Sequence, residues 1–286
     1  MELALLCLSA LVAGAVNSVA GGGTLLTFPA LLSILGNIPN AGVLANATST
    51  VALCPGSVAG IWGYRREYEG MGRWIAYLVG PSLLGGMIGS LLVVLLDPSI
   101  FDRLVPWLIL TATLLLALQP AIARWTGIGK PHDNPSRLTI AGIMVLQFVI
   151  GIYGGYFGAG IGILMLSALA MMGLSDIHRM NGLKSLLAAG INGTSVVIFV
   201  YNNVVRWQYA LPMMGAAIVG GFLGAHYARK LDKTLVRRIV IAIGFSLAGW
   251  FFVKTYYLAP RKTLESTPPV REASQAIGSP AVFRRV

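Results

Sequence analysis

The stretch Asn17-Ser-Val-Ala-Gly-Gly-Gly-Thr24 interrupts the apolar sequence at a point where a membrane helix would be expected to continue. Consecutive glycines allow positive φ angles at little steric cost and leave the backbone poorly shielded. In hydrocarbon, such a break is tolerated only where it is buried in protein or lines a polar cavity. A second break, Gly151-Ile-Tyr-Gly-Gly-Tyr-Phe-Gly-Ala-Gly-Ile-Gly162, follows about half a chain later. We expect the two breaks to face each other and to bind a small solute between them.

The composition is that of a protein built into a lipid bilayer. Hydrophobic residues make up 56% of the 286 residues and charged residues only 11%, whereas a soluble domain carries about 25% charged residues. Apolar runs recur along nearly the whole chain, which predicts an all-α polytopic protein of a cell membrane, with the bacterial inner membrane as the expected location. The net charge of +11 is concentrated in connections and in the C-terminal stretch. Positive-inside bias and anionic lipid account for it, so no nucleic-acid partner is expected.

The apolar segments form two sets of five that match each other in order. They lie at 3–20, 24–36, 43–63, 74–96 and 104–123, and then at 138–157, 161–173, 183–201, 209–228 and 237–258. Glycines 14, 21, 23 and 36 correspond to glycines 151, 158, 160 and 173 at a constant offset, and Asn46-Ala-Thr-Ser49 aligns with Asn181-Gly-Leu-Lys184. The resulting division is a first repeat at 1–123, a linker at 124–137, a second repeat at 138–258 and a disordered polar tail at 259–286.

The second segment of each repeat is too short to cross a bilayer. Segments 24–36 and 161–173 would be about 20 Å long as helices, against a hydrocarbon core of roughly 30 Å. Each is therefore expected to form a broken or re-entrant hairpin with its predecessor. An odd number of segments per repeat gives the halves opposite orientations, which is an inverted repeat. Basic residues in three connections place these connections inside and the N-terminus outside. This orientation also places the basic tail outside, which the positive-inside rule disfavours.

Two groups of residues resemble the TauE/SafE family of sulfite-exporter-like membrane proteins. The first half contains Gly21-Gly-Gly-Thr-Leu-Leu-Thr-Phe-Pro29, Gly36 and Ala45-Asn-Ala-Thr-Ser-Thr50. The second contains Gly155-Tyr-Phe-Gly-Ala-Gly-Ile-Gly162, Gly173 and Asn181-Gly-Leu-Lys-Ser185. The resemblance covers essentially residues 3–257 and implies transport of sulfite, organosulfonates or related anions.

The candidate substrate-binding residues lie in the breaks and in the matching stretches Asn46–Ser49 and Asn181–Ser185 of the segments that follow them. They are Asn17, Gly21, Gly22, Gly23, Thr24, Asn46, Thr48, Ser49, Gly158, Gly160, Asn181, Lys184 and Ser185. Glycine amides could hold an oxyanion or simply allow close helix packing. The Lys184 ammonium could neutralise the solute or extend to the membrane surface. The amide and hydroxyl side chains could be donors to the solute, helix N-caps, or bonds to neighbouring helices.

The sequence favours a carrier over other membrane proteins. No signature of a metalloprotease, a serine hydrolase or a nucleotide-binding loop is present, so neither an enzyme nor a cofactor or metal is expected. We expect a secondary transporter of a small anion working by alternating access, with a proton or sodium as coupling ion. The alternatives are a passive anion channel and a non-transporting membrane protein. Two motifs, Gly85xxxGly89 and Gly220xxxGly224, could pack within the bundle or form a homodimer contact.

Overall fold

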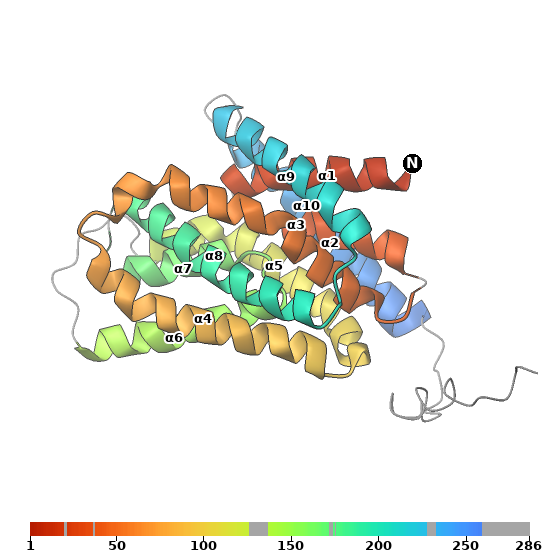
Figure 1. Cartoon of the computed structure of the whole chain (residues 1–286), viewed down its shortest axis with the longest axis horizontal. Coiled ribbons are helices and arrows are strands. Elements are labelled where there is room, and N and C mark those ends of the chain that lie inside the picture. Colours follow the sequence, from red (N-terminus) through yellow and green to blue (C-terminus); the bar gives the residue numbers. More distant parts are fainter. Residues whose placement is uncertain are drawn as a thin grey trace, which may run out of the picture.

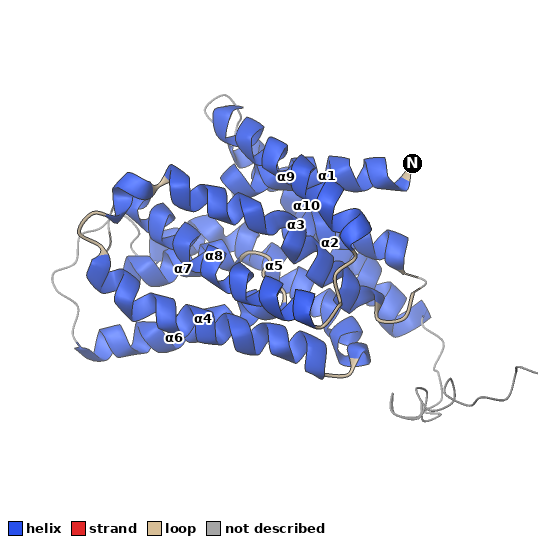
Figure 2. Cartoon of the chain, in the orientation of Figure 1, coloured by secondary structure: helices blue, strands red, loops and turns tan. Residues whose placement is uncertain are grey.

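The computed structural model describes residues 1–19, 22–36, 38–125, 137–171, 174, 176–227 and 233–258. Within these residues the chain is helical and contains no strand (Figure 2). The first half comprises α1 (Glu2–Val19), α2 (Thr24–Leu35), α3 (Ala41–Gly63), the short η1 (Arg65–Tyr68), α4 (Gly72–Leu95) and α5 (Pro98–Trp125). The second half comprises α6 (Arg137–Tyr156), α7 (Ile161–Met171), α8 (Ile177–Tyr201), α9 (Trp207–Tyr227), α10 (Lys233–Val253) and the short η2 (Lys254–Leu258).

The observed helices confirm the predicted all-helical membrane architecture. Five of the described helices are long and apolar enough to cross a membrane, whereas α2 and α7 have only 12 and 11 residues. Three helices begin four to six residues earlier than the apolar pattern indicates, α5 at Pro98, α8 at Ile177 and α10 at Lys233. Their first two turns carry charged residues, so a hydropathy pattern does not detect these helix starts. Asp176 caps α8 by accepting hydrogen bonds from the backbone of His178 (2.8 Å) and Arg179 (3.4 Å).

Glycines bring the helices of the two halves into direct backbone contact. In α4, a Cβ on Gly85 would overlap the carbonyl oxygen of Phe148 in α6. In α9, a Cβ on Gly220 would overlap the carbonyl oxygen of Leu11 in α1. Both motifs therefore pack within the bundle at these glycines, which was one of the two predicted roles.

The main helix contacts of the first half have counterparts in the second half, if each of α1–α5 is replaced by the corresponding helix of α6–α10. Helix α1 packs on α9 as α6 packs on α4, and α3 packs on α9 as α8 packs on α4. Helices α3 and α8 pack against each other, as do α5 and α10; the arrangement of all these helices is drawn in Figure 1. These contacts interleave the two halves into one body rather than leaving them side by side.

Three hydrogen bonds show that α3 and α8 run antiparallel. At one end the Tyr68 hydroxyl donates to the Gly182 carbonyl (3.2 Å), and midway the Asn192 amide donates to Ser57 Oγ (3.1 Å). At the other end the backbone N–H of Arg206 donates to Thr48 Oγ1 (3.0 Å). We call the end at Tyr68 and Gly182 the arginine end, because it carries Arg65 and Arg66 of η1. The opposite end, where Thr48 contacts Arg206, is the Arg206 end.

Candidate functional site

Both glycine breaks contain left-handed backbone that a side chain would strain. Gly22 in the first break has φ +95°, and Gly158 and Gly160 in the second have φ +80° and +76°. The Tyr153 hydroxyl fixes the second break by donating to the Ala159 carbonyl (2.8 Å). Glycine is therefore required at these three positions. Gly21 lies outside the described residues.

Four polar side chains are buried in the apolar core near the Arg206 end, and we call them the hydroxyl–amide cluster. They are Thr27, Asn46, Thr48 and Ser49, each at most 1% exposed. The hydroxyls of Thr27 and Ser49 lie 2.6 Å apart, which joins α2 to α3. The Asn46 amide donates to the carbonyl of Tyr156 (2.9 Å), which joins α3 to the second break. The cluster thus links three elements from both halves.

The hydroxyl–amide cluster has hydrogen-bonding capacity to spare. Thr48 Oγ1 accepts from the Arg206 amide, so its own hydrogen has no acceptor among the described residues. The amide oxygen of Asn46 and the hydroxyl of Tyr156 are buried without a partner in the same residues. Unpaired buried groups of this kind are rare because each costs about 1–3 kcal/mol. They can therefore hold water or a polar solute.

An aromatic cluster lies beside this region and fixes α2 against the second break. The ring of Phe28 in α2 contacts that of Phe157 in the break, with centroids 5.3 Å apart and the rings edge to face. Phe28 also contacts Phe101 of α5 at 6.3 Å, and Phe101 in turn lies 5.4 Å from Tyr156. Fully buried rings leave little room for water on this side of the break. Tyr156 thus contacts the aromatic cluster through its ring and the hydroxyl–amide cluster through its backbone carbonyl.

Lys184 and Asn181 form a second polar cluster, near the arginine end. The Lys184 ammonium donates to the Asn181 side-chain oxygen (3.0 Å), and the lysine stem packs where Gly162 lacks a side chain. No carboxylate lies within 4.0 Å of this ammonium in the described residues, whose one salt bridge joins Arg179 to Asp176. The cation is therefore held by a neutral amide and keeps its charge available to an anion.

The start of α8 is fixed against η1 beside this cluster. Tyr68 donates to the Gly182 carbonyl, and a Cβ on Gly182 would lie 3.3 Å from the Cβ of Tyr64. Burial raises the pKa of the Tyr68 phenol above its ordinary value, and Tyr64 adds to the rise. The phenol is therefore protonated at neutral pH and serves as a donor.

The two polar clusters lie at different depths along the α3–α8 pair. Ser49 and Lys184 are each eight residues from the contact between Ser57 and Asn192, on opposite sides of it. At 1.5 Å rise per residue, each is displaced by about 12 Å along its helix. The shared spot that the sequence suggested, with Lys184 next to the hydroxyl–amide cluster, is therefore not the arrangement in this conformation.

The remaining candidate residues have more local roles. The Ser185 hydroxyl donates to the Asn181 carbonyl of its own helix (2.8 Å). Asn17 and Thr24 are half-buried beside the first break. The N-cap role was considered for Asn46, Thr48, Ser49, Asn181 and Ser185. It is wrong, because α3 begins at Ala41 and α8 at Ile177, before these five residues.

Sequence reasoning missed several buried polar groups. Thr27 belongs to the quoted first motif and lies one turn after Thr24, so its helical spacing could have identified it. Gln147 donates to Ser82 Oγ (2.8 Å) between α6 and α4, and its own amide oxygen is unpaired in the described residues. Gln147 could also have been identified from the sequence, because it is an uncharged amide in the middle of an apolar span.

Long apolar helices with two buried glycine breaks define a multi-pass membrane protein. The family model described as "Sulfite exporter TauE/SafE" matches residues 6–251, and the chain belongs to this family. A "Probable membrane transporter protein" of Haemophilus influenzae is 28% identical over 87% of this chain and 96% of its own length. The "Probable membrane transporter protein YfcA" of Escherichia coli K12 is 25% identical over 84% of this chain and 86% of its own. These relatives are named as transporters, not as enzymes.

Proposed function

We propose that the protein is a secondary transporter that moves a small anion, namely sulfite, an organosulfonate or a related sulfur oxyanion, by alternating access. The family's description as a sulfite exporter and the relatives' names support transport of this kind. The observation that carries the proposal is the hydroxyl–amide cluster, which is buried in the core and retains unpaired groups.

The chemistry of the two clusters suits a sulfur oxyanion. Its oxygens accept hydrogen bonds, and the Thr48 and Tyr156 hydroxyls have hydrogens to donate. Amides of Gly22, Gly23 and Gly160 add further donors at the breaks, whereas the Gly158 amide already donates to the Tyr153 carbonyl (3.2 Å). Lys184 supplies a positive charge nearer the arginine end, where an ammonium without a carboxylate partner attracts an anion. We propose that the anion meets these two clusters in succession.

Alternating access requires two halves that can move against each other, and an inverted repeat provides them. The glycine contacts support this arrangement, because the contact of Gly85 in the first half with Phe148 in the second is matched by that of Gly220 in the second half with Leu11 in the first. We propose repeats at 1–123 and 138–258 with opposite orientations. The linker at 124–137 falls largely, and the tail at 259–286 entirely, outside the described residues.

An ion gradient would drive transport, and two copies of the chain would form the working assembly. We propose coupling to a proton or to sodium, with a homodimer as the assembled form and the arginine end facing the cytoplasm. Coupling predicts that uptake into proteoliposomes responds to an imposed pH or sodium gradient. Assembly is measured by the mass of the purified protein in detergent.

Counterflow of labelled sulfite into proteoliposomes tests the function. A carrier gives saturable uptake that is accelerated by unlabelled sulfite on the opposite side, and a panel of unlabelled sulfonates and other anions ranks the substrates. Large flux that neither saturates nor responds to trans substrate would instead identify a passive channel. Absence of flux for every anion would identify a non-transporting protein.

A further inference from the structure

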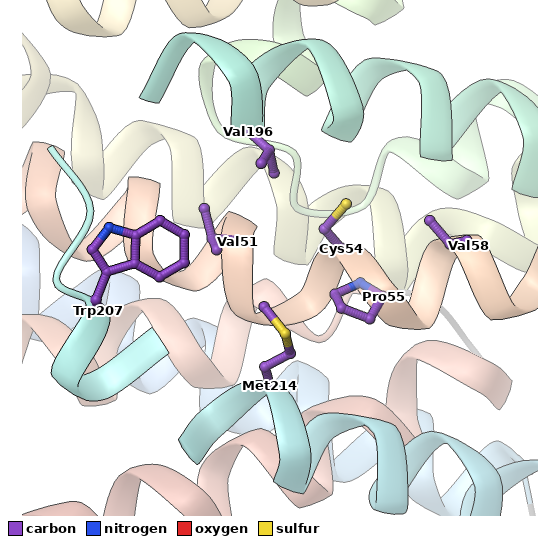
Figure 3. A pocket seen from close by; sticks show the side chains of 7 residues that line it. All are labelled: Val51, Cys54, Pro55, Val58, Val196, Trp207 and Met214. Atoms are coloured by element: carbon purple, nitrogen blue, oxygen red, sulfur yellow. The ribbon is translucent and has the colours of Figure 1, made fainter. Parts of the chain in front are cut away.

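Helices α8 and α9 leave their short connection and diverge, with each packed against α3 (Figure 1). A crevice of about 340 Å³ lies between them, with α3 as its floor (Figure 3). The floor is formed by Val51, Cys54, Pro55 and Val58. Val196 of α8 and Met214 of α9 form the walls, and the lining is apolar apart from the Cys54 thiol and the indole N–H of Trp207.

The crevice lies within the membrane-spanning part of the bundle. Val196 belongs to the span His178–Tyr201, and Val58 at one end of the crevice is 54% exposed. Trp207 lies at the other end (Figure 3). A cavity without polar partners does not hold ordered water. What occupies a lateral apolar crevice in a bilayer is therefore hydrocarbon.

A cationic surface continues from the exposed end of the crevice. One turn beyond Val58 on α3, the ring of Trp62 is 72% exposed. The Arg65 guanidinium lies over that ring, 5.0 Å from its centroid. Neither Arg65 nor Arg66 forms a salt bridge within the described residues, and Glu67 packs towards Gly182 of α8. Tryptophan and arginine at this position are typical of a lipid headgroup region.

We propose that this crevice is a binding site for one anionic phospholipid of the leaflet at the arginine end. One acyl chain lies along α3 from Val58 towards Val51, between α8 and α9. The phosphate-bearing headgroup lies at Arg65 and Arg66, next to the Trp62 ring. The occupant is a lipid rather than the transported anion, because the crevice has no cationic side chain among the described residues that line it. It is lined by hydrocarbon over most of its length, with the indole N–H of Trp207 at one end as its strong hydrogen-bond donor.

Native mass spectrometry of the delipidated full chain tests the proposal. The probes are phosphatidylglycerol and phosphatidylethanolamine with identical acyl chains. One phosphatidylglycerol is expected to remain bound at concentrations where phosphatidylethanolamine does not. Arg65→Gln should weaken phosphatidylglycerol about fivefold, which corresponds to the ~1 kcal/mol attraction of one basic residue at an anionic membrane surface. Equal binding of the two lipids would overturn the proposal.

A matched pair of variants on α8 locates the bound chain. Val196→Trp fills the crevice and should reduce lipid retention at least tenfold. Val197→Trp, at a neighbouring position that is 69% exposed and does not line the crevice, should leave retention unchanged. If both variants lost lipid equally, or if neither lost any, the lipid would be bound elsewhere or only as part of the layer of lipid that surrounds every membrane protein.

Cys54 reports occupancy of the crevice directly. In a Cys7→Ser background, phosphatidylglycerol should slow maleimide alkylation of Cys54 in the wild-type crevice but not in Val196→Trp. Protection by an aromatic sulfonate in place of lipid would overturn the proposal and assign the crevice to the substrate path. These measurements require no transport activity, so their outcome is independent of the proposed function.

Discussion

Lys184 contributes a positive charge whose environment lacks a negative one. Its removal should weaken anion binding without unfolding the protein, because its hydrogen bond is to Asn181, a neighbour on its own helix. A hydrogen bond to a charged group contributes about 1.5–3 kcal/mol, so Lys184→Ala should raise the KM for sulfite counterflow about 10- to 100-fold. Lys184→Arg should retain most of the affinity.

The matched control for Lys184 is Ser185→Ala. The Ser185 hydroxyl is already used within α8, in its bond to the Asn181 carbonyl. Counterflow by Ser185→Ala should therefore keep its wild-type KM. A wild-type KM in Lys184→Ala, with the protein folded, would remove the ammonium from anion binding.

The Thr27–Ser49 hydroxyl pair joins α2 to α3 in the absence of water. Thr27→Val strands the Ser49 hydroxyl, which should cost about 1–3 kcal/mol in the free energy of unfolding. Ser49→Ala should cost less, because Thr27 has a second, longer bond to the Gly23 carbonyl (3.5 Å). The double variant should cost less than the sum, because no hydroxyl is stranded. Denaturant unfolding in mixed micelles measures the cycle, and strictly additive losses would contradict the coupling.

At this scale the sequence identified several of the buried polar residues as candidates but missed Thr27 and Gln147, and it did not identify their partners. Asn46 and Thr48 were candidates because they are amide and hydroxyl side chains in the first-half stretch Ala45–Thr50. Their partners, Tyr156 and Arg206, lie 110 and 158 residues away. Contacts of that range depend on how the halves interleave, which helical spacing within one segment does not encode. The same limit explains why Lys184 and Ser49, aligned in the repeat, were assigned to one spot.

The element scale is governed by helix contacts in which glycine is required for close approach. In α6, a Cβ on Gly155 would overlap the carbonyl oxygen of Gly86 in α4, whereas a Cβ on Gly142 would meet nothing within 4 Å. Gly155→Ala should therefore lower the free energy of unfolding by about 1–3 kcal/mol, as overpacked sites do. Denaturant unfolding in mixed micelles measures the change.

Gly142→Ala serves as the control on the same helix. It should be neutral or stabilising by up to ~1 kcal/mol, because alanine favours the helix over glycine. Equal destabilisation by both variants would mean that backbone freedom, not the α4–α6 contact, sets the effect.

Helix existence was predictable because long apolar segments have few alternatives in a bilayer. Helix starts were less predictable at α5 and α8, where Asp102 and Arg179 lie in turns that a hydropathy pattern assigns to loops. The pairing of α1 with α9 and of α4 with α6 was not predicted either. The glycines that make it possible were identified, but a small-residue motif does not specify its partner helix.

At the scale of the whole molecule, α3 and α8 hold the two halves together along their length. Because the helices belong to different halves, relative motion of the halves must change their contact at one end or the other. At the arginine end, a Cβ on Gly182 would lie 3.3 Å from the Cβ of Tyr64, close to the roughly 3.5–4.5 Å separation found in disulfides. A disulfide there would fix this end of the pair.

Tyr64→Cys combined with Gly182→Cys, in a background with Cys7→Ser and Cys54→Ser, tests whether that motion is required. Oxidation should reduce sulfite counterflow to the background of empty liposomes, and reduction should restore it, because a carrier locked in one conformation cannot expose its site to both sides. Each single-cysteine variant, treated with the same oxidant, should keep its activity. If the cross-linked protein still transported sulfite at its uncross-linked rate, the halves would not need to separate at this end. Flux through a continuous pore would then describe the protein better than alternating access.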